Sequence, residues 1–291
     1  MICHVPRCFR LLAFCLASIA GGTASAGPLT IWVTILPQKY FVERIGGERV
    51  AVEVLVHPGQ SPETYAPSGR QMGRLAKAQL FFGIGMPVER AVLPRLEQSM
   101  TGVRFVQTGP EPVGHAHDHA HGEGCVHGDT DPHVWMDPAW VASTAELIRD
   151  HLIALDPDGA EFYLKRAAAF VGELKELDAE LRERMRPCAG RAFYINHPSL
   201  GHFAEAYGLR QVSVEASGGQ AGARRMAELI KAAKADGVRA VFSQPQFGRS
   251  SVDVLARALG VAVVEVNPLA EDYFENMRAV AEAMEKGLPA L

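Results

Sequence analysis

Hydrophobic and polar residues from Pro28 onward alternate between short apolar runs and longer segments with helical periodicity. Runs such as Leu80–Gly85 are apolar throughout, which is typical of strands buried in parallel sheets. The predicted strands are Leu29–Leu36, Arg49–Val56, Leu80–Gly85, Val103–Gln107, Ala192–Asn196, Gln211–Glu215, Ala240–Gln244 and Val261–Val266. Because helical segments separate these strands, the sequence predicts an α/β fold with two lobes, each a mostly parallel four-stranded sheet flanked by helices.

One predicted helix is much longer than the others and lies between the two groups of strands. Asp156-Pro157 marks its start, with Asp as the N-cap and Pro at the first helical position. An apolar stripe with steps of three and four residues follows, made of Phe170, Leu174, Leu177, Leu181 and Met185. We expect residues 156–187 to form a rigid linking helix of roughly 45 Å, at about 1.5 Å per residue.

The first 26 residues predict a secretory signal peptide. Arg7 and Arg10 precede a short apolar run, and an Ala-x-Ala sequence ends at Ala26. A lipoprotein alternative at Cys15 is disfavoured, because the bulky Phe14 precedes that cysteine. We therefore expect export to the periplasm. The predicted division is a signal peptide at 1–26, an N-terminal lobe at 27–155 with a His-rich loop at 114–130, the linking helix at 156–187 and a C-terminal lobe at 188–291.

Charge and cysteine content narrow the classes of partner. The full chain has a net charge of −4, and loss of the two arginines in residues 1–26 makes it more acidic. A negative chain is a poor partner for nucleic acid, so we expect no nucleic-acid binding. We also expect the protein to be a monomer. After the signal peptide only Cys125 and Cys188 remain, which is too few for a disulfide scaffold. The sequence leaves open whether they pair or whether Cys125 is an additional metal ligand.

The segment from 115 to 133 holds six of the eleven histidines of the chain. Neutral imidazoles separated by small residues cannot form an apolar core, but they suit transition metals. His133 differs from the rest, because two Asp-Pro turns and Trp135 flank it. We expect His133 to be a ligand of the main site. Auxiliary metal ligands that gather or buffer ions are expected at His115, His117, His119, His121 and His127.

Polar residues at the ends of predicted strands give the candidate main site. In open α/β sheets, ligands bind beyond the carboxyl ends of the strands. The residues at such positions are Glu63, His133, His197 and Asn267. Two imidazoles and a carboxylate suit a tetrahedral Zn²⁺ site, with Asn267 or water at the fourth position.

Several other residues compete for roles around this site. His57, His202 and Gln244 are alternatives for completing the metal coordination. A metal-bound histidine usually donates its second ring N–H to a carboxylate or a carbonyl group. The carboxylates in suitable places are Asp131, Asp137 and Glu215.

Five motifs carry a resemblance to a known family. They are Pro62-Glu63-Thr-Tyr65-Ala-Pro67, Asp131-Pro-His133-Val-Trp135, Tyr194-Ile-Asn196-His197-Pro-Ser-Leu-Gly-His202-Phe203, Phe242-Ser-Gln-Pro-Gln246-Phe247 and Asn267-Pro-Leu-Ala-Glu-Asp272-Tyr273. In this order they resemble the zinc- and manganese-binding solute receptors of ABC importers, over nearly the whole chain after the signal peptide. The long helix and the His-rich loop are similar to those of the zinc members.

The resemblance implies a two-lobe receptor that holds a metal ion in the cleft between the lobes and passes it to a membrane permease. His133 and His197 match the second and third ligands of the family. Glu63 replaces the usual first ligand, a histidine, and Asn267 replaces the carboxylate of the manganese members. Gln244 stands where many relatives have Glu. Glu63 favours harder metals, whereas Asn267 removes an oxygen ligand that Mn²⁺ prefers, so we expect Zn²⁺ as the transported ion and Mn²⁺ as the alternative.

Two other classes of function compete with a receptor. An exported zinc hydrolase would use the open metal position to activate water. The chain has no His-Glu-x-x-His helix and no Gly-x-Ser-x-Gly turn, so we expect no enzyme. The second alternative is a metal buffer or chaperone that works through the His-rich loop.

Overall fold

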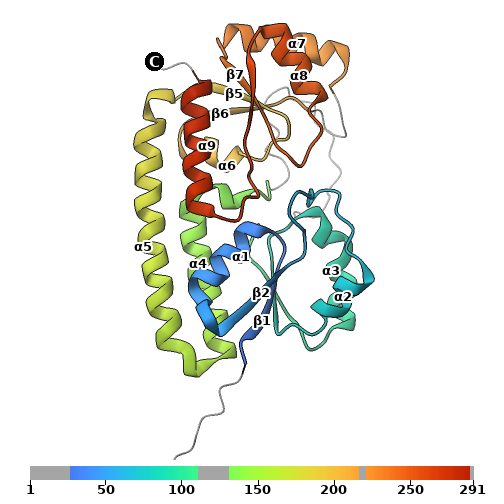
Figure 1. The fold of residues 1–291 in the computed structure, drawn as a ribbon, viewed down its shortest axis with the longest axis vertical. Coiled ribbons are helices and arrows are strands. Elements are labelled where there is room, and N and C mark those ends of the chain that lie inside the picture. Colours follow the sequence, from blue (N-terminus) through green and yellow to red (C-terminus); the bar gives the residue numbers. More distant parts are fainter. Residues whose placement is uncertain (1–26, 111–130, 216–220, 289–291) are drawn as a thin grey trace, which may run out of the picture.

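The computed structural model describes residues 27–110, 131–215 and 221–288, which form two α/β lobes (Figure 1). Each lobe holds one four-stranded sheet, ordered β2-β1-β3-β4 in the first lobe and β6-β5-β7-β8 in the second. Every pairing is parallel. The predicted fold class is therefore confirmed. The predicted signal peptide and His-rich loop lie outside the described residues.

The strands are one to three residues shorter than predicted, and β6 begins one residue earlier than predicted. Their bounds are β1 Leu29–Val33, β2 Val50–Val54, β3 Leu80–Gly83, β4 Arg104–Gln107, β5 Ala192–Ile195, β6 Arg210–Ser213, β7 Ala240–Ser243 and β8 Ala262–Glu265. The α-helices are α1 Leu36–Gly46, α2 Gly69–Leu75, α3 Pro87–Ser99, α4 Pro138–Leu155, α5 Ala160–Met185, α6 Gly201–Ala206, α7 Ala223–Ala235, α8 Ser250–Leu259 and α9 Tyr273–Gly287. Short 3-10 turns are η1 Gly47–Arg49, η2 Val134–Met136, η3 Pro157–Gly159 and η4 Arg186–Cys188.

Local sequence signals fix several helix ends. The hydroxyl of Ser68 accepts the backbone N–H of Gln71 at 3.3 Å, and the Gln71 side chain accepts the backbone N–H of Ser68 at 3.1 Å. These two bonds form a capping box at the start of α2. The carboxylate of Asp137 caps α4 through the N–H of Ala139 at 2.9 Å. Gly260 ends α8 in the left-handed conformation, with φ of 71°.

The long helix α5 contains 26 residues and lies against both lobes. It begins later than predicted, because Pro157–Gly159 forms a 3-10 turn before the α-helix starts. Its predicted apolar stripe is fully buried, from Phe170 to Met185. Figure 1 shows α5 running beside α4 and α1 at one end and beside α9 at the other, and the contacts between these elements agree. The rod is about 39 Å long at 1.5 Å per residue.

One continuous apolar core joins the two lobes. It includes residues of the first sheet, such as Phe82, the buried face of α5, and residues of the second lobe, such as Phe242. At the junction, the rings of Phe41 on α1 and Tyr273 on α9 meet edge to face, with centroids 5.0 Å apart. A second, smaller core packs α7 and α8 against the second sheet. The lobes are therefore tied together by buried apolar area as well as by the chain.

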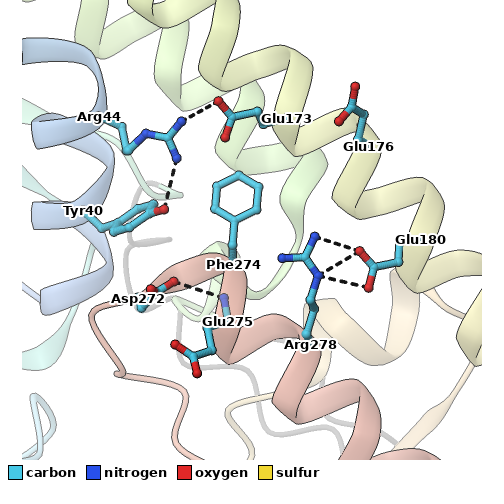
Figure 2. Close-up of a pocket in the computed structure, with 9 residues that line it drawn as sticks. All are labelled: Tyr40, Arg44, Glu173, Glu176, Glu180, Asp272, Phe274, Glu275 and Arg278. Atoms are coloured by element: carbon cyan, nitrogen blue, oxygen red, sulfur yellow. Dashed lines mark hydrogen bonds and ion pairs between the residues drawn. The ribbon is translucent and has the colours of Figure 1, made fainter.

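Charged residues cover the outer side of this junction. A pocket of about 610 Å³ lies where α1, α5 and α9 meet. Figure 2 shows the side chains that line it. Arg44 pairs with Glu173 at 2.6 Å, and Arg278 pairs with Glu180 at 2.8 Å. Exposed ion pairs contribute little to stability, typically about 0–1 kcal/mol each. The apolar contacts beneath them therefore dominate the stability of the junction.

No helix in the described part of the chain combines the length and the apolar character needed to cross a bilayer.

Phe41→Ala tests how much the junction contributes to stability. The Phe41 side chain is fully buried, so its loss leaves a cavity between α1 and α9. We expect the free energy of unfolding to fall by about 3–5 kcal/mol in urea titrations followed by circular dichroism. The control is Leu164→Ala, at a position that is 49% exposed on α5. The free energy of unfolding of this control should differ from that of the parent by no more than about 0.5 kcal/mol. A loss below about 1 kcal/mol for Phe41→Ala would contradict a tightly packed junction.

Candidate metal site

Three predicted ligands from distant parts of the chain meet between the lobes. Glu63 lies in the loop after β2, His133 follows β4 and precedes η2, and His197 follows β5. One ligand atom of each residue lies within 4.8 Å of the others. Oε1 of Glu63 is 4.0 Å from Nε2 of His133 and 3.7 Å from Nε2 of His197. The carboxyl ends of both sheets therefore face one shared site.

His133 is held by its own segment. Oδ1 of Asp131 lies 2.6 Å from Nδ1 of the ring and also accepts the backbone N–H of His133 at 3.0 Å. Burial would raise the pKa of Asp131, but the hydrogen bond and the charge of His133 outweigh it and lower the pKa. An ionised Asp131 favours a proton on Nδ1, which leaves Nε2 with its lone pair toward Glu63.

Trp135 ties this segment to the second lobe. Its indole N–H donates to the backbone carbonyl of Pro268 at 2.8 Å, and both groups are buried. The indole ring also lies beside the His133 ring, with centroids 5.2 Å apart. One side chain thus contacts a candidate ligand and spans the two lobes. The sequence showed Trp135 beside His133 but gave no sign of this hydrogen bond.

His197 is fixed through its backbone and its ring plane. Gln244 accepts the backbone N–H of His197 at 3.2 Å and donates to its carbonyl at 2.6 Å. The imidazole stacks on Phe247, with ring centroids 4.2 Å apart and planes 15° apart. Nε2 is buried and has no hydrogen-bond partner among the described residues. A buried nitrogen without a partner is costly unless a ligand uses its lone pair.

The electrostatics of the site keep His197 neutral. Burial, and then the charge of His133, lower the pKa of His197 to about 3. Burial raises the pKa of Glu63, whereas His133 and Arg90 act in the opposite direction. A neutral imidazole has a free lone pair at neutral pH, which is the form that binds metal.

The other candidate ligands already have partners of their own. Oδ1 of Asn267 accepts from Nε2 of Gln246 at 2.7 Å and from the N–H of Leu269 at 3.1 Å. His57 lies 3.2 Å from the Gln71 side chain, and His202 lies 3.1 Å from the carbonyl of Asp131. Within the described residues, the group of histidine, cysteine and acidic side chains that could hold a metal is limited to Glu63, His133 and His197.

Some residues that were predicted to act at the site make other contacts, and others lie outside the described residues. Asp137 caps α4 through Ala139 and does not orient a ligand. Cys188 is buried, whereas Cys125 lies outside the described residues. The auxiliary histidines also lie outside them, namely His115, His117, His119, His121 and His127.

Sequence reasoning missed two supports of His197. Gln244 was considered as a ligand, but it holds the backbone of His197 and donates to the hydroxyl of Ser199 at 2.8 Å. The stacking role of Phe247 was not foreseen. Its position just after β7, in the same loop as Gln244, was the available signal.

A family model described as "Zinc-uptake complex component A periplasmic" matches residues 31–287. The chain belongs to this family. The zinc-binding lipoprotein AdcA of Streptococcus pneumoniae (strain ATCC BAA-255 / R6) is 29% identical over 297 residues, which cover 97% of this chain and 58% of that protein. The high-affinity zinc uptake system protein ZnuA of Bacillus subtilis (strain 168) is 26% identical, over 91% of this chain and 86% of that protein. This chain thus spans little more than half the length of the streptococcal relative.

Solved structures of the zinc-uptake component A family have the same fold. A crystal structure of ZnuA superposes with a TM-score of 0.81 at 33% identity, covering 89% of this chain and 99% of that one. The Zn(II)-bound ZnuA-like domain of Streptococcus pneumoniae AdcA gives a TM-score of 0.72 at 25% identity, covering 90% and 99%. The predicted resemblance to zinc-type solute receptors is therefore confirmed at the level of the family.

The low pKa of His197 predicts a pH dependence of stability. The unfolded chain binds a proton on this residue below about pH 6.5, whereas the folded chain does so only near pH 3. The neutral form of His197 therefore contributes fully to the free energy of unfolding above about pH 6.5. This contribution is lost as the pH falls, by about 2 kcal/mol at pH 5. We expect His197→Asn to lose less stability than the parent between pH 7.5 and pH 5. Urea titration of chelator-treated proteins measures this, and equal losses in the two proteins would contradict a buried, neutral His197.

Proposed function

We propose that this protein is an exported receptor that binds one Zn²⁺ between its lobes and delivers it to the membrane permease of an ABC importer. The observation that carries the proposal is the buried Nε2 of His197, which has no hydrogen-bond partner in the described part of the chain and faces the Glu63 carboxylate beside His133. A protein site with two imidazoles and one carboxylate suits a tetrahedral zinc ion. The family match and the relatives that are named for zinc binding support the same ion.

The proposed ligands have defined roles. His133 and His197 bind the ion through Nε2, and Glu63 supplies one charged oxygen. Water takes the fourth position, because the side-chain oxygen of Asn267 already accepts two hydrogen bonds. Three protein ligands with an open fourth position hold an ion without enclosing it completely, which suits a cargo that must be released.

The remaining parts of the chain have supporting roles in this proposal. Residues 1–26 direct export to the periplasm, and the mature protein acts there as a monomer and not as an enzyme. The lobes at 27–155 and 188–291 are joined by the linking segment at 156–187. The His-rich loop at 114–130 gathers or buffers metal near the cleft through its auxiliary histidines. Mn²⁺ is the competing cargo, since Glu63 adds oxygen character to the site.

Isothermal titration with Zn²⁺ tests the site. We expect His133→Ala and His197→Ala each to abolish tight binding of one ion per chain, because each removes one of three protein ligands. Deletion of residues 115–129 should remove only weaker, additional ions. His151→Ala is the control, because His151 lies on α4 outside the site. Tight binding that survives His197→Ala, or that is lost with the loop alone, would contradict the proposal.

Glu63→His tests the choice of metal. The change restores three nitrogen ligands, which favour Zn²⁺ over Mn²⁺ more strongly than two nitrogens and a carboxylate do. We expect the ratio of Zn²⁺ to Mn²⁺ affinity to rise by about tenfold or more in competition titrations. Glu48→His, on the exposed turn η1, is the matched control. An unchanged ratio would show that Glu63 does not bind the ion.

A further inference from the structure

Neighbouring side chains hold the backbone and the ring plane of His197, but they do not decide which ring nitrogen carries the proton. Gln244 fixes the backbone of His197 and Phe247 fixes the ring plane. A neutral imidazole carries one ring proton, and binding a metal through Nε2 requires that proton on Nδ1. Some group must therefore accept a hydrogen bond from Nδ1.

The carboxylate of Glu215 lies on that side of the ring. Its Oε2 is 3.7 Å from Nδ1 of His197. Its other oxygen, Oε1, accepts from the side-chain amide of Asn196 at 3.1 Å. The same amide donates to the carbonyl of Gly248 at 2.8 Å, and the backbone N–H of Glu215 donates to the carbonyl of Asn196 at 3.1 Å. The carboxylate is thus anchored beside the ring with one oxygen toward it.

We infer that Glu215 is the positioning residue of His197: it accepts the Nδ1 proton and so keeps the Nε2 lone pair directed at Glu63 and His133. This inference rests on the proposed function. A charge-assisted N–H···O bond has a length of about 2.8 Å, so Oε2 needs to move by about 0.9 Å. We expect a small rotation of the carboxylate to close this gap.

The arrangement at His133 supports this assignment. There, Asp131 lies behind Nδ1 at 2.6 Å, and Nε2 faces Glu63. Each candidate histidine ligand therefore has a carboxylate on the side opposite to the proposed ion, supplied by its own lobe. Glu215 lies just past β6, whereas Asp131 lies two residues before its histidine. Each lobe thus places a carboxylate beside Nδ1 of its histidine, but the two carboxylates come from different positions in the chain relative to that histidine.

Glu215→Gln removes the function of this acceptor with almost no change in shape. Asn196 needs an acceptor for its N–H, so the amide oxygen of the new side chain bonds to Asn196 and its NH₂ group faces Nδ1. An N–H donor at that position favours a lone pair on Nδ1 and a proton on Nε2, which blocks metal binding. We expect ¹⁵N NMR of histidine-labelled, chelator-treated protein to show His197 moving from the Nδ1–H to the Nε2–H tautomer.

Zinc binding gives the second readout. We expect Glu215→Gln to weaken Zn²⁺ binding by about 10–100-fold, chiefly through faster dissociation. Glu205→Gln, on an exposed site of the neighbouring α6, should change neither the tautomer nor the affinity. Circular dichroism and urea titration check that both variants fold. An unchanged His197 tautomer together with an unchanged affinity in Glu215→Gln would overturn the inference.

His197→Ala separates this failure from failure of the proposed function. If that variant loses tight zinc binding while Glu215→Gln keeps it, the site stands and the role of Glu215 is wrong. If His197→Ala keeps tight binding, the proposed function is wrong whatever Glu215 does.

Discussion

The apolar core that runs from the first sheet through α5 into the second lobe sets the distance between the two halves of the site. Phe41 and Tyr273 meet across this junction, and the Phe170 ring on α5 packs against both Tyr40 and Phe274. Separating the lobes would expose these rings to water, at a cost of about 25 cal/mol per Å² of apolar surface. Surface ion pairs such as Arg44 with Glu173 add little to this. The separation of Glu63 from His197 is therefore a property of the core more than of the loops that carry them.

Different interactions hold the three proposed ligands within this rigid pair of lobes. A hydrogen bond to Asp131 fixes the ring of His133. Stacking on Phe247 and two backbone hydrogen bonds to Gln244 fix His197. Glu63 has neither support, and burial, followed by the negative charge of Asp131, raises its pKa. A divalent ion would lower that pKa again, because a positive charge stabilises the ionised carboxylate. Glu63 and the ion therefore stabilise each other, and this is an electrostatic reason for a carboxylate to serve in place of an imidazole.

Sequence patterns predicted the repeated α/β lobes well, since buried parallel strands and capped helices leave strong local signals. Ser68 with Gln71 and Asp137 with Pro138 are local capping patterns of this kind, and they lie at the starts of α2 and α4. The start of α5 was placed too early, because Asp156-Pro157 begins a 3-10 turn as readily as an α-helix. At the site, strand-end position pointed to Glu63, His133 and His197 together. The same rule also pointed to Asn267, whose oxygen instead bonds to Gln246. Such partners, like the bond from Trp135 to Pro268, depend on how the lobes pack, and no local pattern encodes that packing.

The division of the proposed ligands between the lobes bears on how a bound ion would be released. Glu63 and His133 belong to the first lobe, whereas His197 belongs to the second. Gln244 and Phe247, which hold His197, and Glu215, whose carboxylate lies beside its ring, also belong to the second lobe. A small displacement of the second lobe would therefore carry His197 away with its supports intact. It would leave two ligands, one of them a carboxylate, on the first lobe. Because the shared core opposes that displacement, a partner that moves the lobes must supply the free energy. On this geometry, a shift of the second lobe would weaken binding by removing His197, one of the three proposed ligands, from the ion.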